Sequence, residues 1–215
     1  MHKVIAIDGP SGSGKSTITK LLAEKLGFQL LDTGALYRAV ALHLRRQQVE
    51  PESTDAEIRD KLENVSIIFK EGKVLLNGED VSEAIRTTEA GHYASVFSAR
   101  KVVRDFLFQV QRDAALHSDI VAEGRDMTTV VFPDAWKKFY LDASEESRAK
   151  RRYQQLKEKG IATTMEEAIR DVRERDIRDS KRDIAPLKRA EDALYIDTTN
   201  LTPEEVLSLI LSSIR

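Results

Sequence analysis

The chain has 215 residues, and its 34 lysines and arginines are balanced by 36 aspartates and glutamates, which gives a formal net charge of -2. This balance argues against sequence-independent nucleic-acid binding, which requires an excess of basic residues to displace counterions. The chain has no cysteine, so disulfides and thiolate metal sites are excluded. No apolar run approaches the roughly 20 residues that span a bilayer, and no signal peptide is apparent, so we expect a cytoplasmic protein that binds no membrane.

A chain of this length fits a single α/β domain. Short apolar runs that predict buried parallel strands occupy residues 4–7, 29–31, 119–122, 138–141 and 194–196. Helical spacing of apolar residues predicts helices over residues 17–26 and 102–116, and Thr-x-x-Glu capping boxes predict helix starts at Thr164 and Thr202. Because helices alternate with strands, we predict a five-stranded parallel sheet with helices on both faces.

Two segments depart from this alternation. Between residues 65 and 81, apolar stretches separated by Glu71-Gly72 and Asn77-Gly78 predict a small antiparallel hairpin or meander. Between residues 145 and 189 the chain is rich in arginine, and Gly160 is expected to end a helix. A run of charges is often a solvated helix face, so each of these arginines has that alternative interpretation.

The segment that directly follows the first predicted strand reads Gly9-Pro-Ser-Gly-Ser-Gly-Lys-Ser16. The spacing G-x-x-x-x-G-K-[ST] between a strand and a helix is typical of a loop whose main-chain N–H groups surround phosphates. In such a loop Lys15 reaches the β- and γ-phosphates of a nucleoside triphosphate, and Ser16 helps to hold Mg²⁺. A turn without a ligand would not require this lysine. We expect ATP to be bound by Gly9, Pro10, Ser11, Gly12, Ser13, Gly14, Lys15, Ser16 and Thr17.

Other features narrow the class of phosphate-loop protein. No asparagine precedes a lysine, so the base-reading motif of GTPases is missing. Residues 31–38 follow the second predicted strand and Gly124-Arg125-Asp126 follow the third, so both segments should lie at the same sheet edge as the phosphate loop. Arg38 and Arg125 at that edge indicate a second phosphorylated substrate, because guanidinium groups bind phosphate bidentately. A slow ATP-dependent switch protein is the alternative from another functional class.

Beside the phosphate loop, the chain contains Leu31-Asp-Thr-Gly-Ala-Leu-Tyr-Arg38, Asn77-Gly-Glu-Asp-Val-Ser82, Ile85-Arg-Thr87, Glu123-Gly-Arg-Asp126, Val130-Val-Phe-Pro-Asp-Ala135, Arg175-Asp-Ile-Arg-Asp179 and Ala185-Pro-Leu187. In order and spacing these segments resemble bacterial cytidylate kinase, and the resemblance covers essentially the whole chain. One departure is Thr128, since the family commonly has glycine there, in Gly-Arg-Asp-x-Gly-Thr. We expect a local backbone adjustment in the turn that aims Asp126, without loss of activity.

The resemblance implies one P-loop kinase domain over residues 1–215. Its core would comprise residues 1–40, 99–145 and 186–215. A small β-rich insertion that binds the nucleoside monophosphate would occupy about 41–98, and an arginine-rich helical lid about 146–185. The implied reaction transfers the γ-phosphoryl group of ATP, with Mg²⁺, to CMP or dCMP and gives ADP and CDP or dCDP. A kinase for another small acceptor, such as UMP or AMP, is the alternative, and we expect a monomer.

The resemblance also implies roles for individual residues. Asp126 would accept a hydrogen bond from the cytosine amino group and Arg104 would donate to the ring acceptors, a pattern that uracil does not match. Arg38 and Arg125 would bind the acceptor phosphate. From the residues alone, Asp126 could instead orient Arg125, and Arg104 could lie on a solvated helix face. The implied CMP-binding residues are Thr33, Arg38, Ser95, Arg104, Arg125, Asp126, Arg175, Asp179 and Arg182, and the implied catalytic residues are Lys15, Arg125, Arg148 and Arg152.

Overall fold

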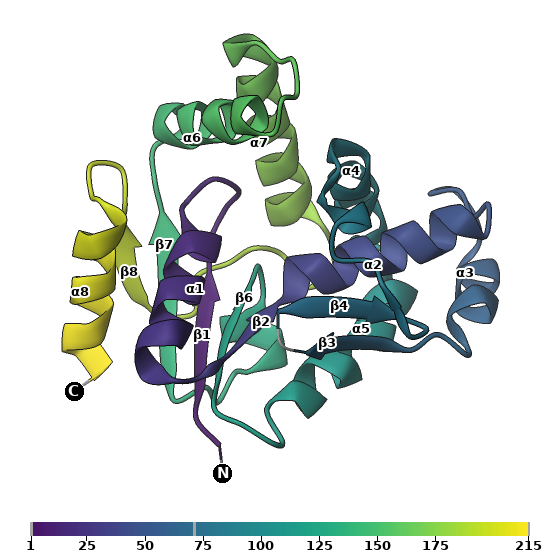
Figure 1. Ribbon diagram of the computed structural model, residues 1–215, viewed down its shortest axis with the longest axis horizontal. Coiled ribbons are helices and arrows are strands. Elements are labelled where there is room, and N and C mark those ends of the chain that lie inside the picture. Colours follow the sequence, from purple (N-terminus) through teal and green to yellow (C-terminus); the bar gives the residue numbers. More distant parts are fainter. Residues whose placement is uncertain (1, 71, 215) are drawn as a thin grey trace.

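Five parallel strands form the main sheet of the protein (Figure 1). They are β1 (Val4–Asp8), β2 (Gln29–Asp32), β6 (Ile120–Gly124), β7 (Lys137–Asp142) and β8 (Leu194–Asp197). Their order is β2-β6-β1-β7-β8, and every neighbouring pair is parallel, so all five predicted strands are confirmed. The structure is a computed structural model that describes residues 2–70 and 72–214, and the predicted turn residue Glu71 lies outside this range.

Helices connect these strands. They are α1 (Lys15–Leu26), α2 (Thr33–Arg46), α3 (Asp55–Leu62), α4 (Thr88–Phe97), α5 (Lys101–Ala114), α6 (Glu145–Glu158), α7 (Met165–Lys181) and α8 (Pro203–Ile214), with the short turns η1 (Ala84–Arg86) and η2 (Met127–Val131). The predicted helices over 17–26 and 102–116 are present as α1 and α5. The capping boxes at Thr164 and Thr202 begin α7 and α8, as predicted.

The two faces of β1 are buried in different cores. Val4 and Ala6 belong to a core that includes side chains of α2 and α5, whereas Ile5 and Ile7 belong to one that includes side chains of α1 and α8. Successive side chains of a strand point to opposite faces, so a strand buried on both sides has the continuous apolar sequence seen here. Helices therefore cover both faces of the sheet, as predicted.

A smaller antiparallel sheet lies beside the main one, on the right in Figure 1. Its strands are β3 (Ile67–Lys70), β4 (Lys73–Leu76) and β5 (Glu79–Asp80). The predicted meander is thus present, and its second turn passes through Asn77 and Gly78, which both have positive φ, as a type I′ hairpin turn requires. The expected start of the insertion, at about residue 41, falls inside α2, which continues without a break to Arg46.

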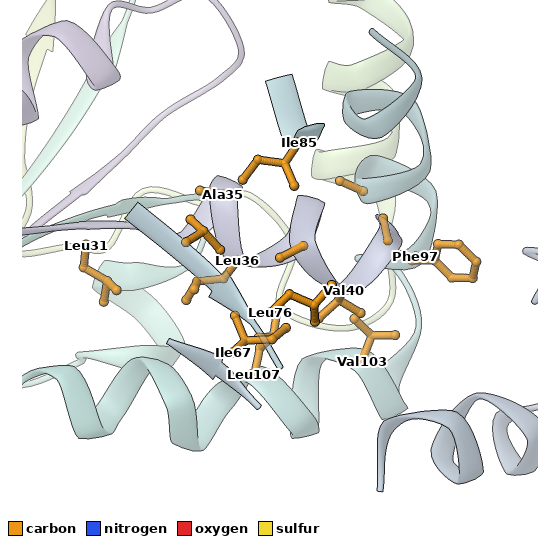
Figure 2. Close-up of a cluster of buried hydrophobic side chains, with 14 of the residues drawn as sticks. Leu31, Ala35, Leu36, Val40, Ile67, Leu76, Ile85, Phe97, Val103 and Leu107 are labelled. Atoms are coloured by element: carbon orange, nitrogen blue, oxygen red, sulfur yellow. The ribbon is translucent and has the colours of Figure 1, made fainter. Parts of the chain in front are cut away.

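The small sheet and the main sheet share one hydrophobic core (Figure 2). Ile67 of β3 and Leu76 of β4 lie in the same buried cluster as Leu31 of β2 and Val103 of α5. Removal of such apolar surface from water contributes roughly 25 cal/mol per Å² to folding. The segment around the small sheet is therefore continuous with the core of the domain.

α6 and α7 pack against each other beyond the carboxyl end of β7, at the top of Figure 1. Gly160, with a φ of 69°, follows the end of α6, which confirms the helix end predicted there. The arginine-rich segment is thereby brought to the edge of the sheet at which the phosphate loop lies. Within residues 2–70 and 72–214, every helix is too short or too polar to cross a membrane.

Candidate active site

The predicted phosphate loop joins β1 to α1 at the carboxyl edge of the main sheet. A Cβ atom at Gly9, where φ is 150°, would lie 1.9 Å from the Leu141 carbonyl oxygen, so only glycine fits there. Gly14 is the N-cap of α1 and has a φ of 93°, a conformation that glycine adopts without a steric penalty. The N-terminus of α1 directs N–H groups and the positive end of its dipole toward this loop, an arrangement that favours a bound anion.

The side chain of Lys15 folds back over the loop that precedes it. Its Nζ donates hydrogen bonds to the Pro10 carbonyl oxygen at 2.7 Å and to Ser13 Oγ at 3.3 Å. Burial, together with the positive charge of Arg125, lowers the pKa of Lys15 to about 7. A phosphate close to this amine would favour its protonated form, because opposite charges stabilise each other most strongly away from water.

Ser16 and Glu123 meet at the start of α1. Ser16 Oγ donates a 2.9 Å hydrogen bond to Glu123 Oε2. Glu123 lies near the end of β6, and burial, together with the negative charge of Asp32, raises its pKa to about 7. The motif Glu123-Gly-Arg-Asp126 does not by itself single out this glutamate. The feature that could have identified Glu123 is a carboxylate on a buried strand, β6, that lies beside the strand before the phosphate loop.

Arg125 follows β6 and pairs with α7. Its Nε donates to Asp179 Oδ2 at 2.7 Å, and its guanidinium also donates to the Gly124 carbonyl oxygen at 3.1 Å. Burial lowers the pKa of Arg175, and the nearby charges of Arg152 and Arg125 act in the same direction. Asp171 forms ion pairs with both Arg152, at 2.7 Å, and Arg175, at 3.0 Å, so α6 and α7 bring two predicted arginines to one carboxylate. Arg125 is joined to the same helix, α7, through Asp179.

The residues predicted to read the base also come together. The guanidinium of Arg104 donates to the Asp126 carboxylate and, at 3.0 Å, to the Ser98 carbonyl oxygen, and both Arg104 and Asp126 are buried. A nitrogen of Arg182 lies 3.9 Å from Asp126 Oδ1. That nitrogen, Nη2, and Ser95 Oγ are buried and have no hydrogen-bond partner among the described residues. Arg104 is thus not on a solvated helix face, and Asp126 pairs with Arg104, whereas Arg125 pairs with Asp179.

Thr33 and Arg38 lie in α2, which starts directly after β2. The Thr33 hydroxyl is buried and donates to the Glu123 carbonyl oxygen at 2.6 Å, so it joins the ends of β2 and β6. The Arg38 guanidinium lies 3.3 Å from Asp32 Oδ2 and is partly exposed. The other carboxylate oxygen of Asp32 accepts a hydrogen bond from the Ala35 amide at 2.9 Å and so caps α2.

Arg148 and Arg152 of α6 have different surroundings. Arg148 donates to the carbonyl oxygens of Ala143 at 2.9 Å and Ser11 at 3.3 Å, and it forms an ion pair with Asp176 at 2.6 Å. These contacts join α6, α7 and the phosphate loop. Arg152 pairs with Asp171 at 2.7 Å and lies near Arg175. Arg148 therefore contacts the loop, whereas Arg152 shares the Asp171 carboxylate with Arg175.

Arg151 lies in the arginine-rich segment that the resemblance implies to be a lid, but it is not among the implied catalytic residues, and it provides a further contact to the phosphate loop. Its guanidinium donates to the Gly12 carbonyl oxygen at 3.3 Å and to Thr198 Oγ1 at 2.9 Å. Thr198 Oγ1 in turn donates to the Ser13 carbonyl oxygen at 3.0 Å. Arg148 and Arg151 are three residues apart on α6 and therefore lie on one helix face, a spacing that could have indicated a shared role.

Two hollows in the described surface lie away from these residues. One is formed by α3 and α5 and the other by β8 and α8, and no predicted site residue lines either of them. The candidate active site is therefore identified by its charged residues at the carboxyl edge of the main sheet. Its parts come from the phosphate loop, from the end of β6 and the segment after it, and from α2, α4, α5, α6 and α7.

Comparison with known proteins shows which family and which solved structures this chain is similar to. A family model described as "Cytidylate kinase" matches residues 5–215. The cytidylate kinase of Thermodesulfovibrio yellowstonii is 56% identical to this chain over 218 residues, covering 100% of this chain and 98% of that protein. The cytidylate kinase of Thermosipho melanesiensis is 52% identical, covering 98% and 96%. A solved structure of an uncharacterized protein from Eubacterium ventriosum has a TM-score of 0.57 at 14% identity, covering 99% of this chain and 98% of that one, and so shares the fold.

Proposed function

The chain belongs to the cytidylate kinase family, and from this membership we propose how its residues transfer the γ-phosphoryl group of ATP to CMP. It is a nucleoside monophosphate kinase, a phosphotransferase whose products are ADP and CDP. The attacking group is a phosphate oxygen that is already ionised at neutral pH, so no strong general base is needed. Catalysis then depends on alignment and on neutralisation of charge.

The observation that carries this proposal is the closeness of Lys15 and Arg125. Lys15 belongs to the donor side and Arg125 to the acceptor side. The loop that carries Lys15 follows β1 and Arg125 follows β6, and these neighbouring strands end in register at Asp8 and Gly124. Two groups that bind anions, one from the loop after β1 and one from the segment after β6, thus lie at one edge of the sheet. A transfer from one phosphate to another needs this arrangement, since both nucleotides must bring their phosphates to one place.

On the donor side, Lys15 and the main-chain N–H groups of residues 9–17 would hold the ATP phosphates. Ser16 Oγ and Glu123 Oε2, 2.9 Å apart, are the oxygen ligands that suit Mg²⁺, which prefers few protein ligands beside phosphate and water. No group of three or more metal-ligating side chains occurs in the described part of the chain, which fits an ion bound largely through the nucleotide. When bound, Mg²⁺ would neutralise charge on the phosphates. Arg148 and Arg151 would keep the loop in shape through Ser11 and Gly12.

On the acceptor side, Arg38, Arg125 and Arg175 would bind the CMP phosphate, and Arg152 would stabilise the transferring group. Asp179 and Arg182 would contact the sugar. Thr33 would act through its hydrogen bond to the backbone at Glu123. Because dCMP has the same base and phosphate as CMP, we include it as an acceptor. We also propose a cytoplasmic monomer without nucleic-acid or membrane partners, in keeping with the nearly balanced charge.

For the base, the buried pair Asp126 and Arg104 complements cytosine. The cytosine amino group can donate to the carboxylate, and the ring acceptors can accept from the guanidinium. Uracil offers a carbonyl and an N–H at these positions and would leave both side chains mispaired. The orphan polar atoms of Ser95 and Arg182 beside this pair support a ligand at this place, since buried polar groups are normally hydrogen-bonded.

A coupled assay of ADP release with CMP, dCMP, UMP and AMP tests the proposal. We expect the highest kcat/KM with CMP and dCMP, and at least about 100-fold lower values with UMP and AMP. Equal or better rates with UMP or AMP would contradict the proposed base reading. ATP hydrolysis that does not respond to any of these acceptors would favour the switch protein instead.

A further inference from the structure

The carboxylate of Asp8 joins the end of β1 to the turn η2. Asp8 is the last residue of β1 and is fully buried. Its two oxygens accept three hydrogen bonds, from the Met127 amide at 2.9 Å, the Thr128 amide at 2.7 Å and the Thr128 hydroxyl at 2.6 Å. Burial raises the pKa of Asp8, whereas these hydrogen bonds act in the opposite direction. All three donors lie in η2.

The position of this contact matters because of its neighbours in the chain. Asp8 directly precedes Gly9, the first residue of the phosphate loop, and Met127 directly follows Asp126. The contact therefore fixes the backbone next to the proposed base-reading carboxylate relative to the central strand of the sheet. The turn itself is closed by hydrogen bonds from the Val130 and Val131 amides to the Asp126 carbonyl oxygen, at 2.9 and 3.1 Å.

Thr128 adds a donor that glycine, the residue common in the family pattern, does not have. It is buried, and its hydroxyl forms the shortest of the three hydrogen bonds to Asp8. The threonine that departs from the pattern is thus accommodated in a π-helical turn and is tied to the sheet. A fully buried carboxyl group depends on such hydrogen bonds, because water does not reach it.

We propose that Asp8 and Thr128 are positioning residues for acceptor selection, and that the Thr128 hydroxyl holds Asp126 in the orientation that distinguishes cytosine from uracil. The inference rests on the proposed role of Asp126 in reading the base. The effect should be confined to the acceptor side, because the phosphate loop has anchors of its own. Its carbonyl oxygens at Ser11 and Gly12 accept from Arg148 and Arg151.

The matched variants Thr128→Val and Thr128→Ser test this inference in the full-length enzyme. Valine keeps the shape and the backbone N–H but lacks the hydroxyl, whereas serine keeps the hydroxyl. For Thr128→Val we expect the ratio of kcat/KM for CMP to that for UMP to fall about tenfold, mainly through KM for CMP, while KM for ATP stays within about twofold. Thr128→Ser should restore most of the ratio. If Thr128→Val does not fold, Thr128→Ala removes the same hydroxyl and takes its place.

Three outcomes would overturn the inference. They are an unchanged CMP-to-UMP ratio in the variants without the hydroxyl, an equal rise of KM for ATP and CMP, and a serine variant as impaired as the valine variant. The variant Asp126→Asn distinguishes a failure of the positioning role of Thr128 from a failure of the proposed base-reading role of Asp126. If Asp126→Asn also leaves the ratio unchanged, the base-reading role fails. If only the Thr128 variants leave it unchanged, the positioning role alone fails.

Discussion

The hydroxyl of Ser16 and the carboxylate of Glu123 form a 2.9 Å hydrogen bond that joins the first turn of α1 to the end of β6. The two residues are 107 positions apart in the chain. The contact places an acidic oxygen at the end of the phosphate loop, next to the residue type that commonly holds Mg²⁺ in such loops. We therefore propose that Glu123 belongs to the donor site, a role that can be measured.

Replacement of Glu123 by glutamine should weaken the use of Mg²⁺. The amide keeps the size and one acceptor oxygen but removes the charge, so we expect kcat to fall about 100-fold and the Mg²⁺ concentration for half-maximal rate to rise. Rates measured over a Mg²⁺ titration at saturating ATP and CMP check this. A lower rate with an unchanged Mg²⁺ midpoint would place Glu123 in a purely structural role.

Replacement of Lys15 by alanine should abolish turnover while the fold remains. Loss of a charge that stabilises the transferring phosphate should lower kcat by about 1000-fold or more. Burial disfavours the charged form of Lys15, as its lowered pKa shows, so the melting temperature should stay the same or rise slightly. Circular dichroism melting and the coupled assay measure the two effects. A large drop in melting temperature would mean that the lost activity reports unfolding.

Replacement of Asp126 by asparagine should narrow the preference for CMP over UMP. An amide can donate as well as accept, so the penalty against the uracil carbonyl falls, and we expect the ratio of kcat/KM values to drop about 10- to 100-fold. The buried pair with Arg104 is weakened at the same time, which should lower stability by roughly 1–3 kcal/mol. The assay is therefore run well below the melting temperature of the variant. A ratio equal to that of the unmodified enzyme would remove Asp126 from base recognition.

Binding of ATP without Mg²⁺ should take up protons near neutral pH. Burial and Arg125 lower the pKa of Lys15 to about 7, and burial and Asp32 raise that of Glu123 to about 7. Added phosphate charge raises both pKa values, so both groups gain protons at pH 7. Isothermal titration calorimetry in two buffers of different ionisation enthalpy measures this uptake, and Lys15→Ala serves as the control with a smaller uptake. A proton uptake that is the same in the unmodified enzyme and in Lys15→Ala would contradict the assignment for Lys15.

The main sheet and its helices could be predicted because their signals are local. Buried parallel strands such as β1 are continuous apolar runs, and the Thr164 capping box closes within one turn. Helices α2 and α4 were harder to predict. α2 starts inside residues 31–38, where the polar residues predict a binding segment more clearly than a helix. α4 has Gly91 in its interior, which lowers helix propensity.

The candidate site was predictable in its motifs but not in its contacts. The burial of Arg104 depends on its pairing with Asp126, which lies on another element and leaves no trace in helical periodicity. The same holds for Asp8 with Thr128, 120 positions apart, and for Gly12 with Arg151, 139 positions apart. Such pairs follow from the order of the strands, which a single sequence does not specify in enough detail.

The hydrophobic cluster that unites β3 and β4 with β2 and α5 has a consequence for engineering. Transplanting residues 41–98 into another kinase would separate Ile67 and Leu76 from Leu31 and Val103, which belong to the same cluster in this chain, and would expose their apolar sides. We therefore expect that acceptor preference in this fold cannot be exchanged as a module. To change the acceptor nucleotide, polar side chains around Asp126 should be replaced while the shared hydrophobic core is kept.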